Sequence, residues 1–288
     1  MFSVIITTLK EPKTLPKAIQ SVLRQNLKDD FEVLVVGPGR ETENIARNFS
    51  KKYTAVRYLK DKRQGKPAAL NLAFKQAEGE ILVLTDGDVL IGQNSLRHLL
   101  RPFKDLNVGA VSGRPVSVNS RETMFGYWSH FLTAAAHQWR LKDNYFPCSG
   151  YLYAFRNIVR NIPEKTFAED GIITSIIRGN NYQVVYAPEA EVYVKYPDNF
   201  RDWLKQKIRS TGGYVQKSET NPKKTRTFRQ EIKDGLILFF TYPKTVKEFF
   251  WTFLLYSARI YLWLMIFWNI KIKNKGFNDI WQRVESTK

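Results

Sequence analysis

The stretch Glu80-Ile-Leu-Val-Leu-Thr-Asp-Gly-Asp88 decides the fold class of this 288-residue chain. Its apolar part is typical of a buried strand, and two carboxylates, Asp86 and Asp88, follow at the strand's end. Ligands of open α/β sheets bind beyond the carboxyl ends of the strands. Carboxylate oxygens suit Mg²⁺ and Mn²⁺, so we predict that this pair holds a divalent ion against a diphosphate. The alternative is a plain turn, because Asp and Gly are common turn formers.

Strands and helices alternate around this stretch, which predicts a Rossmann-like α/β fold. Short β-branched runs at Val4 to Ile6 and Glu32 to Val36 indicate strands, and the segment between them repeats apolar residues at helical spacing. Strands that alternate with single helices imply right-handed crossovers and a mostly parallel sheet with helices on both faces. The expected helices cover 14–26, 42–53 and 67–77, and further strands cover 55–59 and 80–85.

Charge and cysteine content restrict the partners and the compartment. The chain has 45 Lys and Arg against 27 Asp and Glu, a formal net charge of +18, so an anionic partner is expected. Nucleic acid, anionic lipid and nucleotide phosphates all fit that charge. The single cysteine, Cys148, excludes an internal disulfide and favours a reducing, cytosolic environment. The N-terminus shows no secretory signal, so we expect most of the chain to stay on the side where it is made.

The C-terminal third differs in character from the rest. We expect a catalytic domain over 1–215, a basic linker over 216–234, and a hydrophobic and basic segment over 235–288. Residues 249–270 are almost wholly apolar, with Arg259 as their one charge, and are long enough to cross about 30 Å of hydrocarbon. We therefore predict membrane attachment, either as a span or as a helix in the membrane interface. A buried core helix is the alternative.

Three further groups of polar residues are candidates for chemistry. Glu169 and Asp170 precede an apolar helix, where one carboxylate could take the proton of an acceptor hydroxyl or simply cap the helix. Gln206 and Arg209 are spaced i, i+3 on one helix face and could grip a diphosphate, although a solvated basic face has the same pattern. Lys66 could contact phosphate near the N-terminus of the helix that follows it.

Taken in this order, the segments resemble the family-two glycosyltransferases with a GT-A fold. The resemblance covers roughly residues 2 to 215. It rests on Val4 to Glu11, Ala18 to Gln25, Gly65 to Asn71, Asp86 with Asp88, Ser149-Gly150 followed by Ala154 to Arg156, Glu169-Asp170, and Gln206 with Arg209.

The resemblance implies a metal-dependent, inverting glycosyltransferase of the hexosyltransferase type that uses a nucleotide diphosphate sugar. It implies that Asp88 is the principal metal ligand, that Asp86 contacts the nucleotide or the metal, and that Asp170 is the base. The ion, Mg²⁺ or Mn²⁺, would stabilise the departing diphosphate. The implied donor-binding residues are Thr8, Glu11, Lys66, Asp86, Gln206 and Arg209, and the implied acceptor-side residues are Ser149, Gly150 and Glu169.

The expected partners follow from the same resemblance. They are the nucleotide sugar, a glycan or lipid-linked acceptor that offers a hydroxyl or a phosphate, and an anionic membrane surface. The catalytic domain is expected at the cytoplasmic face of the membrane, and no nucleic acid is expected to bind, because no recognisable DNA- or RNA-binding motif appears.

Three departures from the family pattern concern the donor and the product. Val36-Gly37-Pro38-Gly39 stands where many relatives carry Asp-Asp-Gly-Ser, so the usual carboxylate for the nucleotide base is missing. Lys10 occupies a position that is often Asn. Ser210 replaces the Trp associated with processive synthesis, which argues against a long polymer product.

Other functions are compatible with parts of the pattern. Nucleotidyltransferases share this sheet logic but typically need a Gly-rich phosphate loop after the first strand, and Thr7 to Pro16 contains no glycine. A basic protein that binds nucleic acid or lipid without catalysis fits the charge alone. The main alternative is a catalytically degenerate protein of the same fold that binds a nucleotide sugar or a membrane.

Overall fold

The computed structural model describes residues 1–25, 27, 30–142, 146–164, 166, 168–220, 228–268 and 286–287, with the backbone alone for 211–220 and 228–234. The chain forms two compact units. The first unit comprises Met1–Val116 and Asn144–Val194, and the second unit comprises Ser117–Asp143 and Lys195–Thr287. Residues 117–143, which the sequence analysis assigned to the catalytic domain, therefore pack with the C-terminal part of the chain.

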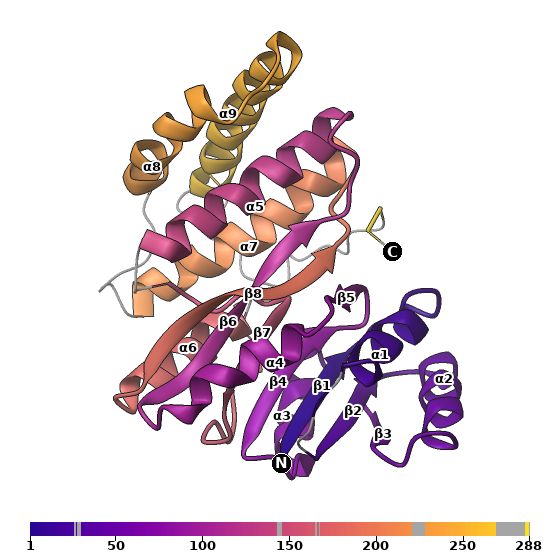
Figure 1. The fold of residues 1–288 in the computed structure, drawn as a ribbon. Coiled ribbons are helices and arrows are strands. Elements are labelled where there is room, and N and C mark those ends of the chain that lie inside the picture. Colours follow the sequence, from indigo (N-terminus) through magenta and orange to yellow (C-terminus); the bar gives the residue numbers. More distant parts are fainter. Residues whose placement is uncertain are drawn as a thin grey trace. The chain divides into compact units, whose positions relative to one another are not determined.

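An eight-stranded sheet forms the centre of the first unit (Figure 1). Its strands are β1 (Phe2–Thr7), β2 (Phe31–Gly37), β3 (Val56–Lys60), β4 (Ile81–Asp86), β5 (Val89–Ile91), β6 (Val108–Ser117), β7 (Leu152–Arg156) and β8 (Gln183–Val194). They lie in the order β3-β2-β1-β4-β7-β6-β8-β5. β1 to β4 pair in parallel, whereas β7 pairs antiparallel with β4 and β6, and β5 pairs antiparallel with β8.

The predicted α/β fold is confirmed, and the parallel half of the sheet is made of the strands that the alternation predicted. Its strands β1, β2 and β4 are short and almost wholly buried, as parallel strands covered by helices must be, and the edge strand β3 is only partly buried. The sequence predicts a mostly parallel sheet, whereas the strands β7, β6, β8 and β5 form an antiparallel half, so the sheet is mixed. The parallel register pairs Thr7 with Asp86, which sets the end of β1 beside the first aspartate of the predicted metal pair.

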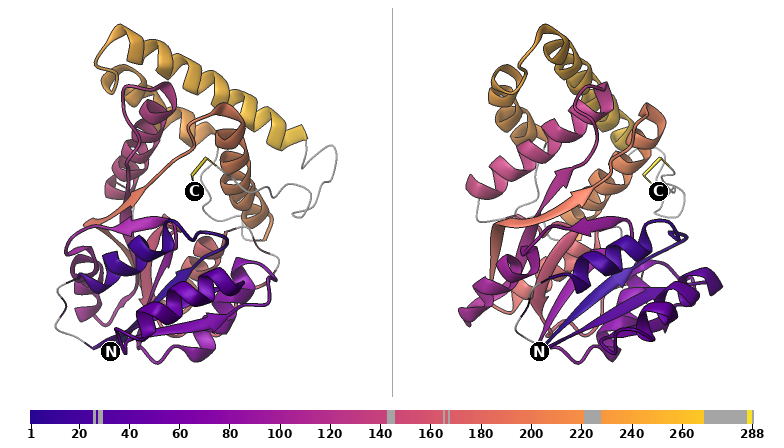
Figure 2. Two further views of the ribbon diagram at one scale, coloured as in Figure 1. Left: turned by 90° about the vertical axis from the view of Figure 1, so that its right-hand side faces the viewer. Right: turned by 45° about the vertical axis from the view of Figure 1, so that its right-hand side comes forward.

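Helices lie on both faces of this sheet (Figure 2). α1 buries Leu15, Ala18, Ile19 and Val22 at helical spacing, as its sequence pattern predicts. Pro16 fits its first turn, where a missing N–H costs no helical hydrogen bond. The helical elements of the first unit are α1 (Leu15–Leu23), α2 (Arg40–Ser50), α3 (Lys66–Gln76), α4 (Ser95–Leu100), the 3₁₀ helix η1 (Arg101–Lys104) and α6 (Glu169–Gly179).

The described part of the second unit is helical. Its helices are α5 (Met124–Lys142), α7 (Phe200–Thr220), α8 (Phe228–Thr241) and α9 (Val246–Phe267). The predicted linker over 216–234 overlaps the end of α7 and the start of α8, and residues 221–227 lie outside the described residues. Within the described ranges, α9 is also the single helix that is long and apolar enough to cross a membrane by length and composition.

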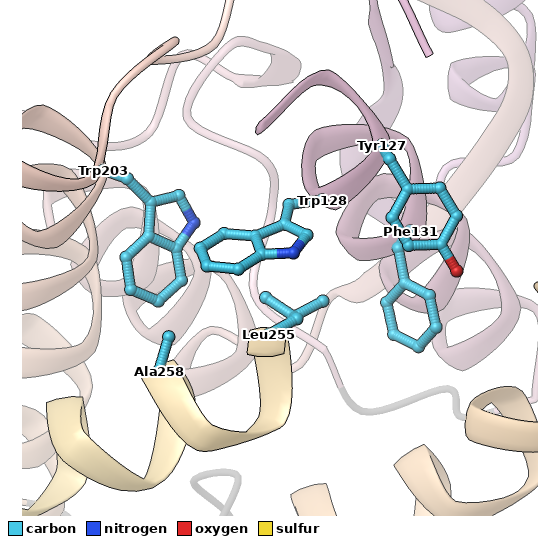
Figure 3. Packing of buried hydrophobic residues seen from close by; sticks show 6 residues of the cluster. All are labelled: Tyr127, Trp128, Phe131, Trp203, Leu255 and Ala258. Atoms are coloured by element: carbon cyan, nitrogen blue, oxygen red, sulfur yellow. The ribbon is translucent and has the colours of Figure 1, made fainter. Parts of the chain in front are cut away.

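An aromatic cluster forms the core of the second unit (Figure 3). The rings of Trp128 in α5 and Trp203 in α7 lie edge to face with their centroids 5.2 Å apart. Leu255 and Ala258 of α9 pack against them. Burial of large aromatic side chains is a major source of folding free energy, so this cluster explains why residues 117–143 associate with the C-terminal helices.

Candidate active site

The ends of β1 and β4 hold the first aspartate of the predicted metal pair in place. The hydroxyl of Thr7 donates to Asp86 Oδ1 at 2.9 Å. The backbone N–H of Gly87 donates to the Thr7 carbonyl oxygen at 2.9 Å, which continues the strand pairing into the turn. Asp86 and Asp88 therefore stand at the carboxyl end of a central parallel strand, where ligands of open sheets bind.

The loop after β1 packs against the turn between the two aspartates. The Thr8 hydroxyl donates to Glu11 Oε2 at 3.0 Å, and both side chains are buried. A Cβ atom added to Gly87 would lie 2.8 Å from Glu11 Oε2 and 2.8 Å from Thr8 Oγ1. The structure thus brings Thr8 and Glu11, two of the implied donor-binding residues, into direct contact with the Asp86-Gly87-Asp88 turn.

We expect Gly87→Ala to lower the free energy of unfolding by about 1–3 kcal/mol, the usual cost of overpacking a tight site. The added methyl group must displace Thr8 or Glu11, so donor binding should weaken as well. Gly179→Ala is the matched control, because its Cβ would have no neighbour within 4 Å. Denaturant melts and donor titration of both variants test the packing. Equal behaviour of the two variants would contradict it.

Lys66 lies between two carboxylates from different elements. Its Nζ atom is 2.7 Å from Asp86 Oδ1 and 2.8 Å from Glu169 Oε1. Burial alone lowers the pKa of Lys66, but Asp86 and Glu169 outweigh burial and raise that pKa well above its ordinary value. Lys66, at the first position of α3, thereby links the strand end at Asp86 to the start of α6 at Glu169. The ammonium group of Lys66 could also interact with an anionic ligand bound at the carboxyl end of β4.

The first turn of α6 carries both acids that the sequence analysis selected. Ala168 is the N-cap residue of α6, so neither Glu169 nor Asp170 occupies the capping position. The backbone N–H of Gly171 donates to Asp170 Oδ1 at 2.7 Å, and the positive end of the helix dipole favours a carboxylate here. Asp170 Oδ2 lies 3.3 Å from the position that a Cβ on Gly150 would occupy. The carboxylate of Asp170 therefore borders the predicted acceptor-side loop.

Buried hydroxyls, which sequence reasoning missed, hold that loop. Thr174 Oγ1 accepts from the backbone N–H of Cys148 at 3.0 Å, and Ser112 Oγ accepts from that of Ser149 at 2.9 Å. The Thr85 hydroxyl donates to the Tyr151 carbonyl oxygen at 3.0 Å. Their sequence signal is weak, because Ser and Thr are common in strands and helices and nothing local shows which backbone group each will meet.

Tyr153 is a further residue that the sequence did not single out. It belongs to β7, is 1% exposed, and its hydroxyl has no hydrogen-bond partner within the part of the chain that the structure describes. Burial raises the pKa of Tyr153 well above its ordinary value, and the negative charges of Glu169 and Asp170 act in the same direction. The Tyr153 hydroxyl therefore stays protonated at neutral pH, within the electrostatic influence of Glu169 and Asp170.

Two predicted donor-binding residues belong to the second unit. Gln206 and Arg209 both lie in α7, so the expected helical i, i+3 spacing is present. The side chain of Gln206 is buried, and that of Arg209 is half-buried. Their role toward the residues of the first unit stays a prediction.

The chemistry of the predicted metal pair fits a hard divalent ion with few protein ligands. Among the residues that the structure describes, no group of three or more His, Cys, Asp or Glu side chains gathers as a candidate cage. Asp86 uses Oδ1 for both Thr7 and Lys66, so neither contact involves Oδ2. Mg²⁺ sites commonly use one or two carboxylates and fill the other positions with substrate phosphate and water. A pair such as Asp86 and Asp88 is sufficient for that kind of site.

The first unit has a GT-A-type fold. Its features are paired aspartates after a central parallel strand, a buried loop after the first strand, and an acid at the start of a helix. The chain belongs to glycosyltransferase family 2. The model of that family, described as "Glycosyl transferase family 2", matches residues 3–162.

Curated relatives agree with this membership. The chain is 24% identical over 229 residues to the probable glycosyltransferase YdaM of Bacillus subtilis, covering 73% of this chain and 54% of that protein. It is 23% identical over 233 residues to an N-acetylglucosaminyltransferase of Azorhizobium caulinodans, covering 72% of this chain and 57% of that protein. The chain thus matches a little over half the length of these relatives.

Solved structures share the fold. The mannosyltransferase PcManGT from Pyrobaculum calidifontis, in complex with GDP-Man and Mn²⁺, aligns with a TM-score of 0.61 at 19% identity, over 95% of this chain and 80% of that one. Staphylococcus aureus TarS 1-349, in complex with UDP, aligns with a TM-score of 0.51 at 19% identity, over 73% of this chain and 64% of that one. At this identity the likeness concerns the fold.

Proposed function

We propose that this chain transfers a sugar from a nucleotide diphosphate donor to an acceptor hydroxyl or phosphate, with inversion at the anomeric carbon. The observation that carries the proposal is the cluster in which Lys66 joins Asp86 to Glu169, with Asp170 as the next residue. In this cluster Asp86 and Lys66, which are expected on the donor side, lie next to Glu169, which is expected on the acceptor side. Membership of glycosyltransferase family 2 supports the reaction class.

Asp170 serves as the general base in this proposal. The acceptor oxygen forms a bond to the anomeric carbon while the bond from that carbon to the diphosphate oxygen breaks. The acceptor proton moves to a carboxylate oxygen of Asp170, which borders Gly150 in the acceptor-side loop. A single displacement of this kind inverts the configuration and needs only one catalytic carboxylate. Ser149, Gly150 and Glu169 would shape the acceptor side.

Asp86 and Asp88 would hold Mg²⁺ or Mn²⁺, and the ion would supply Lewis-acid stabilisation of the departing diphosphate. Thr8 and Glu11 would contact the nucleoside, because they pack directly on the Asp86-Gly87-Asp88 turn. Lys66 would add a positive charge near the phosphates. Gln206 and Arg209 of α7 keep their predicted role as diphosphate-binding residues, because an amide and a fixed guanidinium suit phosphate oxygens.

The donor and the acceptor are open within this proposal. The structural neighbours bind GDP-Man or UDP, and several relatives are named N-acetylglucosaminyltransferases, so GDP-mannose and UDP-N-acetylglucosamine are the first donors to test. A glycan or a lipid-linked acceptor, presented at the cytoplasmic face of a membrane, suits the apolar helix α9.

A donor screen tests the proposed activity. We expect slow hydrolysis of one nucleotide sugar, or transfer once a working acceptor is found, with Mn²⁺ or Mg²⁺ present and a loss of turnover in EDTA. Nuclear magnetic resonance of the product should show the inverted anomer. Binding of a donor without any turnover, across donors and acceptors, would favour the degenerate alternative. Retention of configuration would contradict the role of Asp170 as a base.

A further inference from the structure

α9 presents one apolar face to solvent along its whole length. Residues at helical spacing are exposed from its first turn to its last, and α8 adds a second exposed strip. Soluble monomers seldom leave so large a continuous apolar surface uncovered. The residues of this apolar face are Leu236, Ile237 and Phe240 of α8, and Phe249, Phe250, Phe253, Ile260, Tyr261, Leu264 and Phe267 of α9.

The opposite face of α9 is attached to protein over most of its length. The hydroxyls of Thr252 and Tyr127 lie 2.6 Å apart, and the Trp128 indole N–H donates to the Trp251 carbonyl oxygen at 2.8 Å. Farther along the helix, Leu262 and Ile266 are buried. α9 therefore lies along α5 and α7 as a packed member of the second unit, with only its outer face uncovered.

That packing argues against α9 as a membrane span. Ala258, near the middle of α9, packs in one cluster with Trp203 of α7. Trp203 is preceded by Asp202, which accepts from Lys205 at 3.4 Å. A spanning α9 would bring these charges toward the centre of the hydrocarbon, where charged side chains are costly. A helix that lies in the membrane plane keeps them on the water side.

The positive charge of the second unit indicates that the partner of the apolar face is an anionic lipid surface. Residues 117–143 and 195–287 of the second unit contain 21 Lys and Arg against 10 Asp and Glu. Lys244 and Lys247 are exposed beside the start of α9, and Lys247 Nζ lies 4.5 Å from the centre of the Trp251 ring. Basic and aromatic residues that border an apolar helix face are typical of binding to anionic lipid. A second copy of the chain would instead bring two cationic units together.

We propose that α8 and α9 lie flat in the interface of an anionic bilayer, with the apolar face immersed and α9 not crossing the membrane. α8 and α9 are fixed to each other for this purpose. The ring centroids of Phe239 and Phe249 are 5.2 Å apart, and those of Phe239 and Tyr256 are 5.0 Å apart. The Tyr256 hydroxyl donates to the Gly235 carbonyl oxygen. The proposal does not depend on the proposed transfer reaction.

Spin labels at three positions along α9 separate the two orientations. Cysteine is introduced at Phe250, Ser257 or Leu264, which are exposed and seven residues apart on one helix face, in a Cys148→Ser background. On vesicles of phosphatidylcholine with phosphatidylglycerol, power saturation should give the three nitroxides nearly the same depth, about 5–10 Å below the headgroups. A span predicts steps of about 10 Å between successive labels. Such steps, or labels that stay in water, would overturn the proposal.

Vesicle sedimentation tests the apolar and the charged parts separately. We expect the double substitution Phe250→Ser/Phe253→Ser to weaken binding about 10-fold or more, because two immersed aromatic side chains are lost. Lys244→Glu/Lys247→Glu should weaken binding to anionic vesicles and reduce its dependence on salt. Leu106→Ser, an exposed leucine of the first unit, is the matched control and should bind like the wild type.

Two further measurements keep this test decisive. The melting curves of the variants should match that of the wild type, because the changed side chains are exposed. Light scattering without lipid tests whether the apolar face joins two copies of the chain. We expect no dimer whose formation depends on Phe250 and Phe253, so the Phe250→Ser/Phe253→Ser change should leave the measured mass unchanged. Such a dimer, or equal binding of all variants to vesicles, would assign the apolar face to another partner and refute the membrane proposal.

Discussion

Replacement of Asp170 by Asn should reduce sugar transfer by about 10²- to 10⁴-fold, the usual scale of general-base catalysis. Asn keeps the size of the side chain and an oxygen that can accept from the Gly171 N–H, but it cannot take a proton. The binding constant of the donor should barely change. Transfer rates with a working acceptor, donor titration by calorimetry and a melting curve measure these three properties on one preparation.

The structure makes this substitution more informative than the sequence alone did. Ala168, not Asp170, is the N-cap of α6, so the change leaves the capping position intact. Glu169→Gln is the companion variant. Because Glu169 pairs with Lys66 at 2.8 Å, its loss should disturb Lys66 and donor binding rather than proton removal. Near-normal turnover in Asp170→Asn would refute the base assignment and make Glu169 the next candidate.

The parallel half of the sheet follows from local sequence signals. The apolar run before Asp86 and the apolar spacing of α1 and α3 each determine an element within about ten residues, and strand-helix alternation then implies the order of those elements. The site residues that end these elements follow in turn. For this reason Lys66 and Asp86 could be selected before their contacts were known, whereas Thr8 and Glu11 were selected from the resemblance to the family-two glycosyltransferases.

The antiparallel half carried no such signal. β8 (Gln183–Val194) contains Pro188 within an otherwise regular strand, and Pro is usually evidence against a strand assignment. β6 and β8 belong to the sheet through pairing partners far away in the sequence. The association of residues 117–143 with the C-terminal helices is equally non-local, because it depends on rings such as Trp128 and Trp203 that meet only in the folded chain.

The role of Lys66 could be predicted only in part. Its position before α3 suggested a phosphate contact, but its pairing with Glu169 links residues more than one hundred positions apart in the sequence. The buried hydroxyls of Ser112 and Thr174 pose the same problem, since each meets a backbone N–H of another element. Contacts of this kind depend on tertiary packing, which neither periodicity nor spacing encodes.

Asp88→Asn should abolish the dependence of donor binding on a divalent ion while the fold stays intact. In the presence of Mn²⁺, we expect donor affinity to fall by on the order of 100-fold or more, because even residues that only support metal ligands contribute 10- to 100-fold. Asp88 is the site of change because it is the proposed principal metal ligand. Asp86 also accepts from Thr7 and pairs with Lys66, so its loss would mix a structural effect with the metal effect.

The measurement is a calorimetric titration of the donor with Mn²⁺, with Mg²⁺ and in EDTA, on the wild type, on Asp88→Asn and on Asp105→Asn. Asp105 is an exposed aspartate whose Oδ1 accepts from the Asn107 N–H, so its variant controls for the loss of one negative charge. The wild type and Asp105→Asn should bind the donor more tightly with the ion than in EDTA. Asp88→Asn should bind it equally weakly in both. Equal donor affinity with and without ion in all three proteins would show that binding needs no metal, and the Asp86 and Asp88 pair would then be a turn that supports Thr8 and Glu11.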